Sequence, residues 1–144
     1  MDVKIKYLPN AKQRPEYATG GSVGMDLAAA VDAPVVIKAG KRELVPTGIA
    51  LQIPEGYAGF VFPRSGLSMK KGITMANSVG VIDNDYTGEI KLAMLNVSSK
   101  DYTINPGDRV AQLVFIPIAH ARLVEVESLE KTERGDGGFG STGM

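Results

Sequence analysis

The sequence predicts an all-β fold of the sandwich or jelly-roll type. Short β-branched runs recur along the chain, and 17 glycines and 8 prolines place frequent breaks between them. Helix-forming pattern is confined to residues 66–71, which suffice for one or two turns. Many short strands separated by turns are typical of sandwiches and jelly rolls rather than of βαβ units. At 144 residues the chain has the length of one common domain.

Strands are expected wherever apolar and polar residues alternate, or where a short apolar run lies between breaks. These conditions predict strands at residues 3–7, 35–37, 48–53, 57–62, 90–97 and 109–118, with a weaker period-two pattern at 121–127. Turns are expected at the sequences PEG (54–56), DYTG (85–88) and NPGD (105–108).

Composition excludes several function classes. Sixteen basic and sixteen acidic side chains give a formal net charge of zero, which argues against a general nucleic-acid binder. No apolar run is long enough to predict a membrane span, and charges near the N-terminus argue against a signal peptide, so we expect a cytoplasmic protein. The absence of cysteine excludes thiolate chemistry, and the single histidine, His120, has no acid or nucleophile beside it.

The last fifteen residues, 130–144, differ from the rest of the chain. They are polar and rich in glycine, so they cannot bury a core of their own. Composition alone favours a disordered terminus. The alternative is a lid, in which glycine backbone wraps phosphates while Arg134 and Phe139 supply a cation and a stacking face. We therefore divide the chain into a domain at 1–129 and a flexible arm at 130–144.

Two segments carry candidate chemistry. In the sequence PRSGLS (63–68), Arg64 offers a fork of donors to an anion, although the segment taken alone favours a strand-ending turn with a surface arginine. In GVIDNDYTGE (80–89), a hairpin-like context places Asp83 at a strand end, where a carboxylate could orient and deprotonate a water molecule. The alternative is that Asp83 and Asp85 are turn residues that bind their own backbone.

Other candidates are weaker. The Asn77 amide has the donor and acceptor needed to read a pyrimidine edge, or it belongs to a turn. Strict alternation places Arg109 and Gln112 on opposite faces of a strand, so they are not expected to serve one ligand atom together. Asp26 is a lone carboxylate in an apolar, glycine-flanked stretch, which suggests a cation, an arginine or a metal-bound water as its partner.

Five segments in this order resemble the five motifs of the trimeric deoxyuridine triphosphate nucleotidohydrolases, the dUTPase family. The segments are GMDL (24–27), PRSGLS (63–68), GVIDNDYTGE (80–89), GDRVAQLVF (107–115) and RGDGGFGSTG (134–143). The third and fifth are long and specific, and the resemblance spans almost the whole chain.

The resemblance implies a β jelly-roll (β-clip) subunit of a homotrimer whose active sites are shared, with the arm of one chain closing a site formed by the other two. It implies hydrolysis of dUTP to dUMP and pyrophosphate with Mg²⁺ on the triphosphate, which keeps uracil out of DNA and supplies dUMP for thymidylate synthesis. No nucleic-acid or membrane partner is expected.

The resemblance also implies roles for individual residues. Asp83 would orient the attacking water, Tyr86 would lie under the deoxyribose, and Asp26 would reach Mg²⁺ through water. The hairpin from 77 to 91 would read uracil, largely through backbone groups. The implied substrate-binding residues are Arg64, Ser65, Gly66, Asn77, Val81, Ile82, Asp83, Tyr86, Lys91, Gln112, Arg134, Phe139, Gly140 and Ser141.

Two alternatives stay open. A deoxycytidine triphosphate deaminase shares the expected fold, and Glu89 is a candidate for its catalytic acid. The sequence from Asn84 to Tyr86 favours hydrolysis over deamination. The other alternative is an inactive regulatory trimer that binds a nucleotide and a protein partner, against which the presence of Asp83 and of a full arm both argue.

Overall fold

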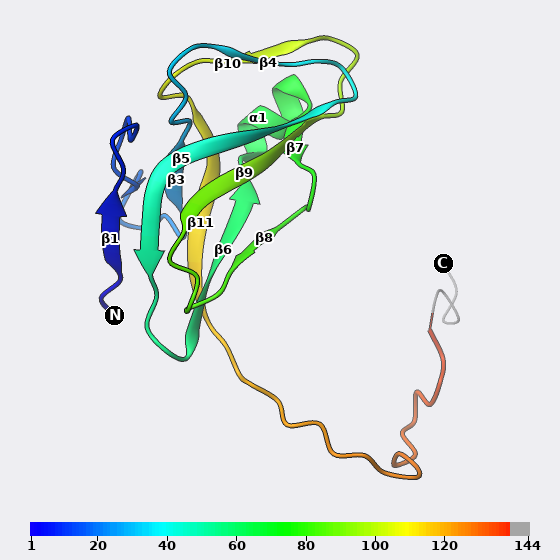
Figure 1. Ribbon diagram of the computed structural model, residues 1–144. Coiled ribbons are helices and arrows are strands. Elements are labelled where there is room, and N and C mark those ends of the chain that lie inside the picture. The colour runs from blue at the N-terminus through cyan, green and yellow to red at the C-terminus, as the bar shows by residue number, and fades with distance from the viewer. Residues whose placement is uncertain (139–144) are drawn as a thin grey trace.

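The computed structural model describes residues 1–138, and within them it is built almost entirely of β-strands (Figure 1). The one helix of this part of the chain is α1 (Ser65–Lys71). The strands are β1 (Lys4–Tyr7), β2 (Glu16–Tyr17), β3 (Met25–Ala28), β4 (Val35–Ile37), β5 (Arg42–Gln52), β6 (Tyr57–Pro63), β7 (Ile73–Met75), β8 (Gly80–Ile82), β9 (Glu89–Asn96), β10 (Tyr102–Ile104) and β11 (Arg109–Pro117).

Two principal sheets form the sandwich. One has the strand order β1-β5-β9-β7 and the other the order β2-β3-β11-β6-β8, while β10 and β4 make a separate pair. All strand pairs are antiparallel. This arrangement confirms the all-β, jelly-roll prediction.

The core lies between the two sheets. On β9, buried Ile90, Leu92 and Met94 alternate with more exposed neighbours, as expected for a strand with one face inward. The facing sheet contributes Val61 and Leu113, each 1% exposed. Full burial of one such aliphatic side chain contributes about 1.5–3 kcal/mol to stability. The core therefore holds β6, β9 and β11 rigidly, and these strands carry or adjoin the candidate site residues.

Most expected strands are present, with shifted bounds. The strand expected at 48–53 begins earlier, at Arg42, because the chain passes through an irregularity between Pro46 and Ala50 without ending. Gly48 in this irregularity has a φ of 69°, and a Cβ there would lie 2.5 Å from the Ala11 backbone. The close approach explains why a glycine interrupts the strand pattern without being a turn.

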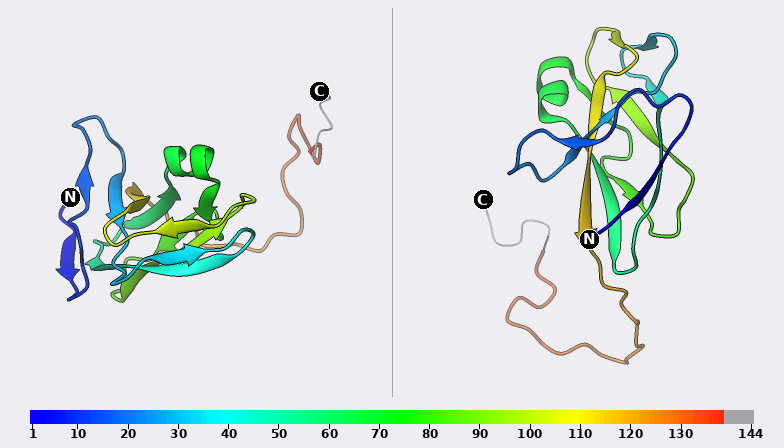
Figure 2. Two further views of the ribbon diagram at one scale, coloured as in Figure 1. Left: turned by 90° about the horizontal axis from the view of Figure 1, so that it is seen from above. Right: turned by 90° about the vertical axis from the view of Figure 1, so that its left-hand side faces the viewer.

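The strand expected at residues 121–127 is wrong for this chain taken alone. The last strand ends at Pro117, and residues 119–136 are exposed, including Leu123 at 93%. Both views show this segment running away from the sheets (Figures 1 and 2). A strand needs a paired neighbour, and within residues 1–138 no sheet edge lies alongside this segment.

The hairpin expected between residues 77 and 91 is also wrong. Within the described chain β8 pairs with β6, whereas β9 pairs with β5 and β7 in the other sheet. The two strands therefore diverge from a shared loop, as Figure 1 shows. Over residues 1–138, the structure contains no helix that is long and apolar enough to cross a membrane.

Candidate functional site

One cavity of about 500 Å³ lies where β3, β11 and the start of α1 meet. We call it the cationic cavity. Its charged lining consists of four cations and one carboxylate, Arg64, Lys70, Lys71, Arg109 and Asp26. The uncharged lining residues are Ala18, Ser22, Val23, Gly24, Ser65, Gly66, Leu67, Tyr102 and Gln112. A net charge of three positive makes this cavity suited to a polyanion.

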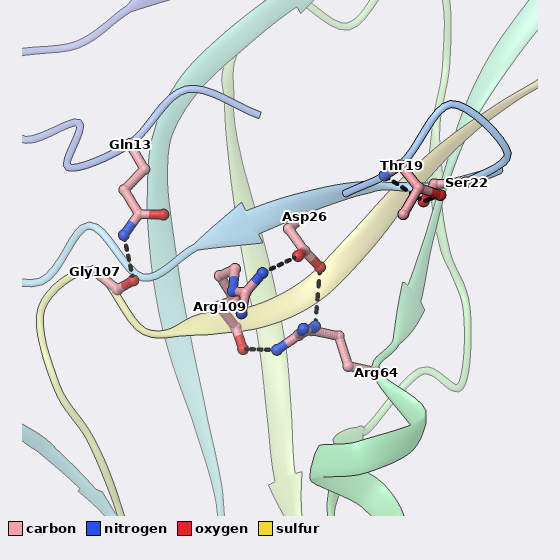
Figure 3. Close-up of polar contacts among 7 residues, drawn as sticks. All are labelled: Gln13, Thr19, Ser22, Asp26, Arg64, Gly107 and Arg109. Carbon is pink, nitrogen blue, oxygen red and sulfur yellow. Dashed lines mark hydrogen bonds and ion pairs between the residues drawn. The ribbon is translucent and has the colours of Figure 1, made fainter. Parts of the chain in front are cut away.

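Asp26 joins two arginines that line this cavity (Figure 3). Its Oδ1 lies 2.9 Å from Arg64 Nε and its Oδ2 lies 2.9 Å from Arg109 Nη1. Arg64 Nη1 also donates to the Arg109 carbonyl oxygen at 3.1 Å. Of the partners suggested for Asp26, the structure shows arginine. Because the carboxylate contacts only part of each guanidinium, further donors of both arginines are available to an anion.

The prediction that Arg109 and Gln112 lie on opposite faces is wrong. Gln112 pairs with Asp26 and Arg109 pairs with Ala28, but a β-bulge shifts the register between Arg109 and Ala111. The extra residue reverses the alternation, so Arg109 and Gln112 line the same cavity. Val110 and Ala111 are both buried, so the inward and outward alternation is interrupted at this bulge.

Gln112 is held in place by close backbone packing. Its Nε2 donates to the Pro63 carbonyl oxygen at 3.1 Å. A Cβ at Gly24 would lie 2.9 Å from Gln112 Oε1 and 3.2 Å from its Cβ. Gly24 therefore allows the amide to sit at the cavity wall, which is a packing reason for glycine beside Asp26.

Three ionisable residues of this cavity were not singled out from the sequence. Lys70 and Lys71 follow Leu67 by three and four residues, so helix geometry places them on its side of α1. That spacing was the signal available in the sequence. The third is Tyr102, for which the sequence offered no signal; burial, with a smaller effect of the Asp108 charge, raises the pKa of its phenol. Its hydroxyl is therefore protonated at neutral pH and able to donate a hydrogen bond.

A second cavity, of about 310 Å³, lies between the diverging strands β8 and β9. We call it the strand-gap cavity. Its lining residues are Val81, Ile82, Asp83, Tyr86, Glu89, Ile90 and Lys91. The structure thus brings together five residues of the predicted base- and sugar-binding set, and it separates them from the cationic cavity, with which this cavity shares no lining residue.

The strand-gap cavity is bounded by backbone that strand pairing leaves open. β8 is the terminal strand of its sheet. On β9, pairing with β7 covers only Met94 to Asn96 among the described residues, so the backbone from 89 to 92 is unpaired on that side. Open strand edges present alternating N–H and C=O groups, the pattern needed to bind the edge of a planar amide or base.

The loop between these strands is locally ordered. Tyr86 N–H donates to the Asp83 carbonyl oxygen at 3.2 Å, which places the turn at residues 83–86 rather than at 85–88 as expected, and Tyr86 Oη donates to the Glu89 carbonyl oxygen at 2.8 Å. A Cβ at Gly88 would lie 2.7 Å from Tyr86 Oη, so glycine lets the ring lie over the backbone in this position. The Asp83 carboxylate is exposed and forms no ion pair with any residue between 1 and 138.

The Glu89 carboxylate makes contacts that stabilise the fold. Its Oε1 accepts hydrogen bonds from the Gly48 backbone N–H at 3.0 Å and from Asn10 Nδ2 at 3.4 Å, and its Oε2 lies 3.8 Å from Lys91 Nζ. These contacts tie β9 to the irregularity in β5. They give the carboxylate a structural role, which weighs against the deaminase alternative.

The remaining predicted residues lie elsewhere or outside the described chain. Asn77 is exposed before β8, with its Nδ2 3.7 Å from the position of a Cβ on Gly80, and does not line the strand-gap cavity. Arg134 lines neither cavity, and its Nε donates to the Gly137 carbonyl oxygen at 2.8 Å. Phe139, Gly140 and Ser141 fall outside the described residues.

The side chains of the described residues limit how a metal ion could bind. Residues 1–138 contain no group of three or more carboxylate, histidine or cysteine ligands, and each oxygen of Asp26 already contacts an arginine. Such a set does not form a direct cage for a divalent ion. It fits Mg²⁺ that is bound mainly by phosphate oxygens and water, with Asp26 accepting a hydrogen bond from that water, because Mg²⁺ gives up its waters reluctantly.

The family model described as dUTPase matches residues 10–143. The deoxyuridine 5'-triphosphate nucleotidohydrolase of Hydrogenobaculum sp. (strain Y04AAS1) is 49% identical over 144 residues, covering 100% of this chain and 99% of the relative. That of Rickettsia bellii (strain OSU 85-389) is 51% identical over 143 residues, covering 99% and 95%.

Solved structures agree. The Staphylococcus bacteriophage 80alpha dUTPase with dUpNHpp superimposes with a TM-score of 0.90 at 30% identity, covering 99% of both chains. A mutant dUTPase from phage phi11 of S. aureus, described with the coordination of a structural Mg(II) ion, has a TM-score of 0.80 at 28% identity, covering 91% of this chain and 100% of that one. The match over nearly the whole sequence and fold establishes that this chain belongs to the dUTPase family of enzymes.

Proposed function

We propose that the protein hydrolyses dUTP to dUMP and pyrophosphate at a site that combines the two cavities. The observation that carries the proposal is the division of lining groups. One cavity gathers four cations around a single carboxylate, and the other places an exposed aspartate beside open strand edges. A nucleoside triphosphate has the same division into a polyanion and an uncharged base.

In the proposed reaction, Asp83 acts on the attacking water. Its carboxylate accepts a proton as the water oxygen forms a bond to the α-phosphorus. The bond from the α-phosphorus to the oxygen bridging it to the β-phosphorus breaks in line, and pyrophosphate leaves. Arg64 and Arg109, held together by Asp26, stabilise the negative charge on the phosphate oxygens as it redistributes.

The base is assigned to the strand-gap cavity. Uracil presents acceptor, donor and acceptor groups along one edge, which suits the edges of residues 81–83 and 89–91 that no neighbouring strand covers in the described chain, although the Asp83 and Glu89 carbonyl oxygens already accept hydrogen bonds from Tyr86. A thymine methyl group is expected to clash in this narrow space. The Tyr86 ring, folded over Gly88, is placed under the deoxyribose, where it leaves no room for a 2′-hydroxyl group.

Magnesium belongs to the proposal as an ion carried by the triphosphate. When bound, it would neutralise phosphate charge, and Asp26 would hold it through water. In this scheme the triphosphate is oriented by four residues that line the cationic cavity: Arg64, Ser65, Gly66 and Gln112.

The proposed assembly is a homotrimer with shared sites. Two features support it: the cavities share no lining residue within one chain, and the segment after β11 exposes apolar side chains without a partner in the described chain. Leu123 and Leu129 are 93% and 87% exposed. Contact with neighbouring subunits would bury them. Arg134, Phe139, Gly140 and Ser141 would then reach a neighbour's site.

This activity would remove dUTP before it is incorporated into DNA and would supply dUMP for thymidylate synthesis. A cytoplasmic location stays a prediction of the sequence.

The direct test is a product assay with purified protein, Mg²⁺, and dUTP, dCTP, dTTP and UTP in parallel. We expect dUMP and pyrophosphate from dUTP alone. Ammonia released from dCTP would assign the protein to the deaminase reaction. No turnover of any of the four nucleotides would contradict hydrolysis and favour a regulatory role.

A further inference from the structure

The net charge of the cationic cavity comes mainly from two lysines that the five motif segments leave without a role. Asp26 contacts both Arg64 and Arg109 at 2.9 Å, so one negative charge offsets this arginine pair in part. Lys70 and Lys71 form no ion pair with any residue of the described chain, 1–138. They therefore supply two of the three net positive charges in the cavity.

The helix that carries the lysines is anchored at Leu67 and Ser68 and at its C-terminal end. Leu67 packs against the hydrophobic core, and Ser68 Oγ donates to the Ile73 carbonyl oxygen at 3.0 Å. Gly72 ends α1 in the left-handed region with a φ of 67°, and a Cβ there would lie 2.8 Å from Ser98 Cβ. The helix cannot rotate without breaking these contacts.

This fixed helix determines which side chains face the cavity. Ser65 and Gly66 line it from the N-terminal end of α1, and Leu67, Lys70 and Lys71 line it as residues three and four apart on one helix face should. Met69, between them, does not line the cavity and is 86% exposed. The position of each lysine along α1 therefore determines that its charge faces the cavity. A positive charge at residue 69 would lie outside the cavity.

We propose that Lys70 and Lys71 set the affinity of this site for the length of the phosphate chain, so that a triphosphate is preferred over shorter phosphates. The proposal rests on the proposed function in its assignment of the phosphate chain to this cavity. Longer chains carry more charge, and the attraction to each lysine grows with the number of charged phosphates within a Debye length.

The test uses inorganic tripolyphosphate, pyrophosphate and orthophosphate as probes, titrated calorimetrically into the full-length protein without divalent ions. We expect Lys70→Gln and Lys71→Gln each to weaken tripolyphosphate binding about fivefold. The loss should be smaller for pyrophosphate and smallest for orthophosphate, and it should shrink as salt rises. Kinetics with dUTP should show a higher KM with little change in kcat.

Two controls separate a directed charge from net charge. Lys4→Gln removes a cation from β1, far from this lining, and should leave binding unchanged. The double variant Met69→Lys with Lys70→Gln restores the net charge of α1 off the cavity and should bind like Lys70→Gln alone. Size-exclusion chromatography and thermal unfolding verify that each variant has the fold and assembly of the unaltered protein.

Failure of this inference is distinguishable from failure of the proposed function. Lysine variants that bind all three probes like the unaltered protein, a relocated charge that restores binding, or unaltered protein that does not bind tripolyphosphate would each overturn the inference. If the protein binds tripolyphosphate in a lysine-dependent manner but turns over no nucleotide, the lysine assignment stands and hydrolysis fails.

Discussion

The two cavities of this chain are built in opposite ways. The cationic cavity is made of charged side chains that hold one another, as Asp26 does with Arg64 and Arg109. The strand-gap cavity lies between two strand edges that are open because β8 and β9 belong to different sheets. Substitutions should therefore affect the cationic cavity through charge and hydrogen bonding. They should affect the strand-gap cavity mainly where they change the path of the backbone.

Asp83 is the exception in the strand-gap cavity, and its substitution should have the largest effect on activity. Asp83→Asn removes the carboxylate that accepts the proton from water while keeping the size of the side chain. We expect kcat to fall about 1,000-fold. dUTP affinity, measured by equilibrium binding, should stay within about threefold because the groups assigned to base and phosphate remain. Substantial residual turnover would remove Asp83 from its role.

Substitution of Arg64 tests the role of the cationic cavity. Arg64→Ala removes a cation and leaves Asp26 with one arginine, so kcat/KM for dUTP should fall about 100-fold. Arg64→Lys restores the charge without the planar fork and should recover only part of that loss. Steady-state kinetics distinguish these results. An alanine variant within twofold of the unaltered protein would show that this cavity does not bind the reacting phosphates.

Gly24 tests whether the cavity depends on close packing. The Cβ of Gly24→Ala would displace the Gln112 amide, whose Oε1 lies 2.9 Å from that position, so kcat/KM should fall about fivefold through one weakened hydrogen bond. Gly21→Ala is the matched control in the same loop, because a Cβ there meets nothing within 4 Å. Equal losses in both variants would contradict this packing role.

Val81 should give the smallest effect. Its side chain is 59% exposed, and the proposed base contacts in this region use backbone groups. Val81→Thr keeps the branched shape and the strand, so kcat/KM for dUTP and the preference over dCTP should change by less than about twofold. A tenfold loss, or a changed base preference, would show that side chains rather than backbone read the base.

The sequence predicted the parts of this molecule that depend on local pattern. Alternation located β1, β6, β9 and β11 within a few residues, and the expected phosphate-binding residues Arg64, Ser65, Gly66 and Gln112 do share one cavity with Asp26. The strands follow from apolar alternation, which acts over a few residues, whereas the phosphate-binding set follows from the resemblance to the dUTPase motifs.

The errors concern features that depend on distant pairing. Whether Val110 adds a bulge is decided by the register of β11 against β3. Whether the chain on either side of Asp83 forms a hairpin is decided by the separate sheets that β8 and β9 join. Residues 121–127 have the alternation of a strand, but the described chain offers them no edge to pair with. None of these decisions is contained in the segment itself.

The central claim is that each working site takes its two cavities from different chains. The most direct measurement is complementation between two inactive variants, Arg64→Ala and Asp83→Asn, unfolded together, refolded as mixed oligomers and assayed with dUTP. Some sites would then pair an intact cationic cavity with an intact Asp83 from a neighbour, which predicts activity about one quarter of that of the unaltered protein at equal mixing. Folded mixed oligomers that remain inactive would show that one chain supplies both cavities and would contradict the account.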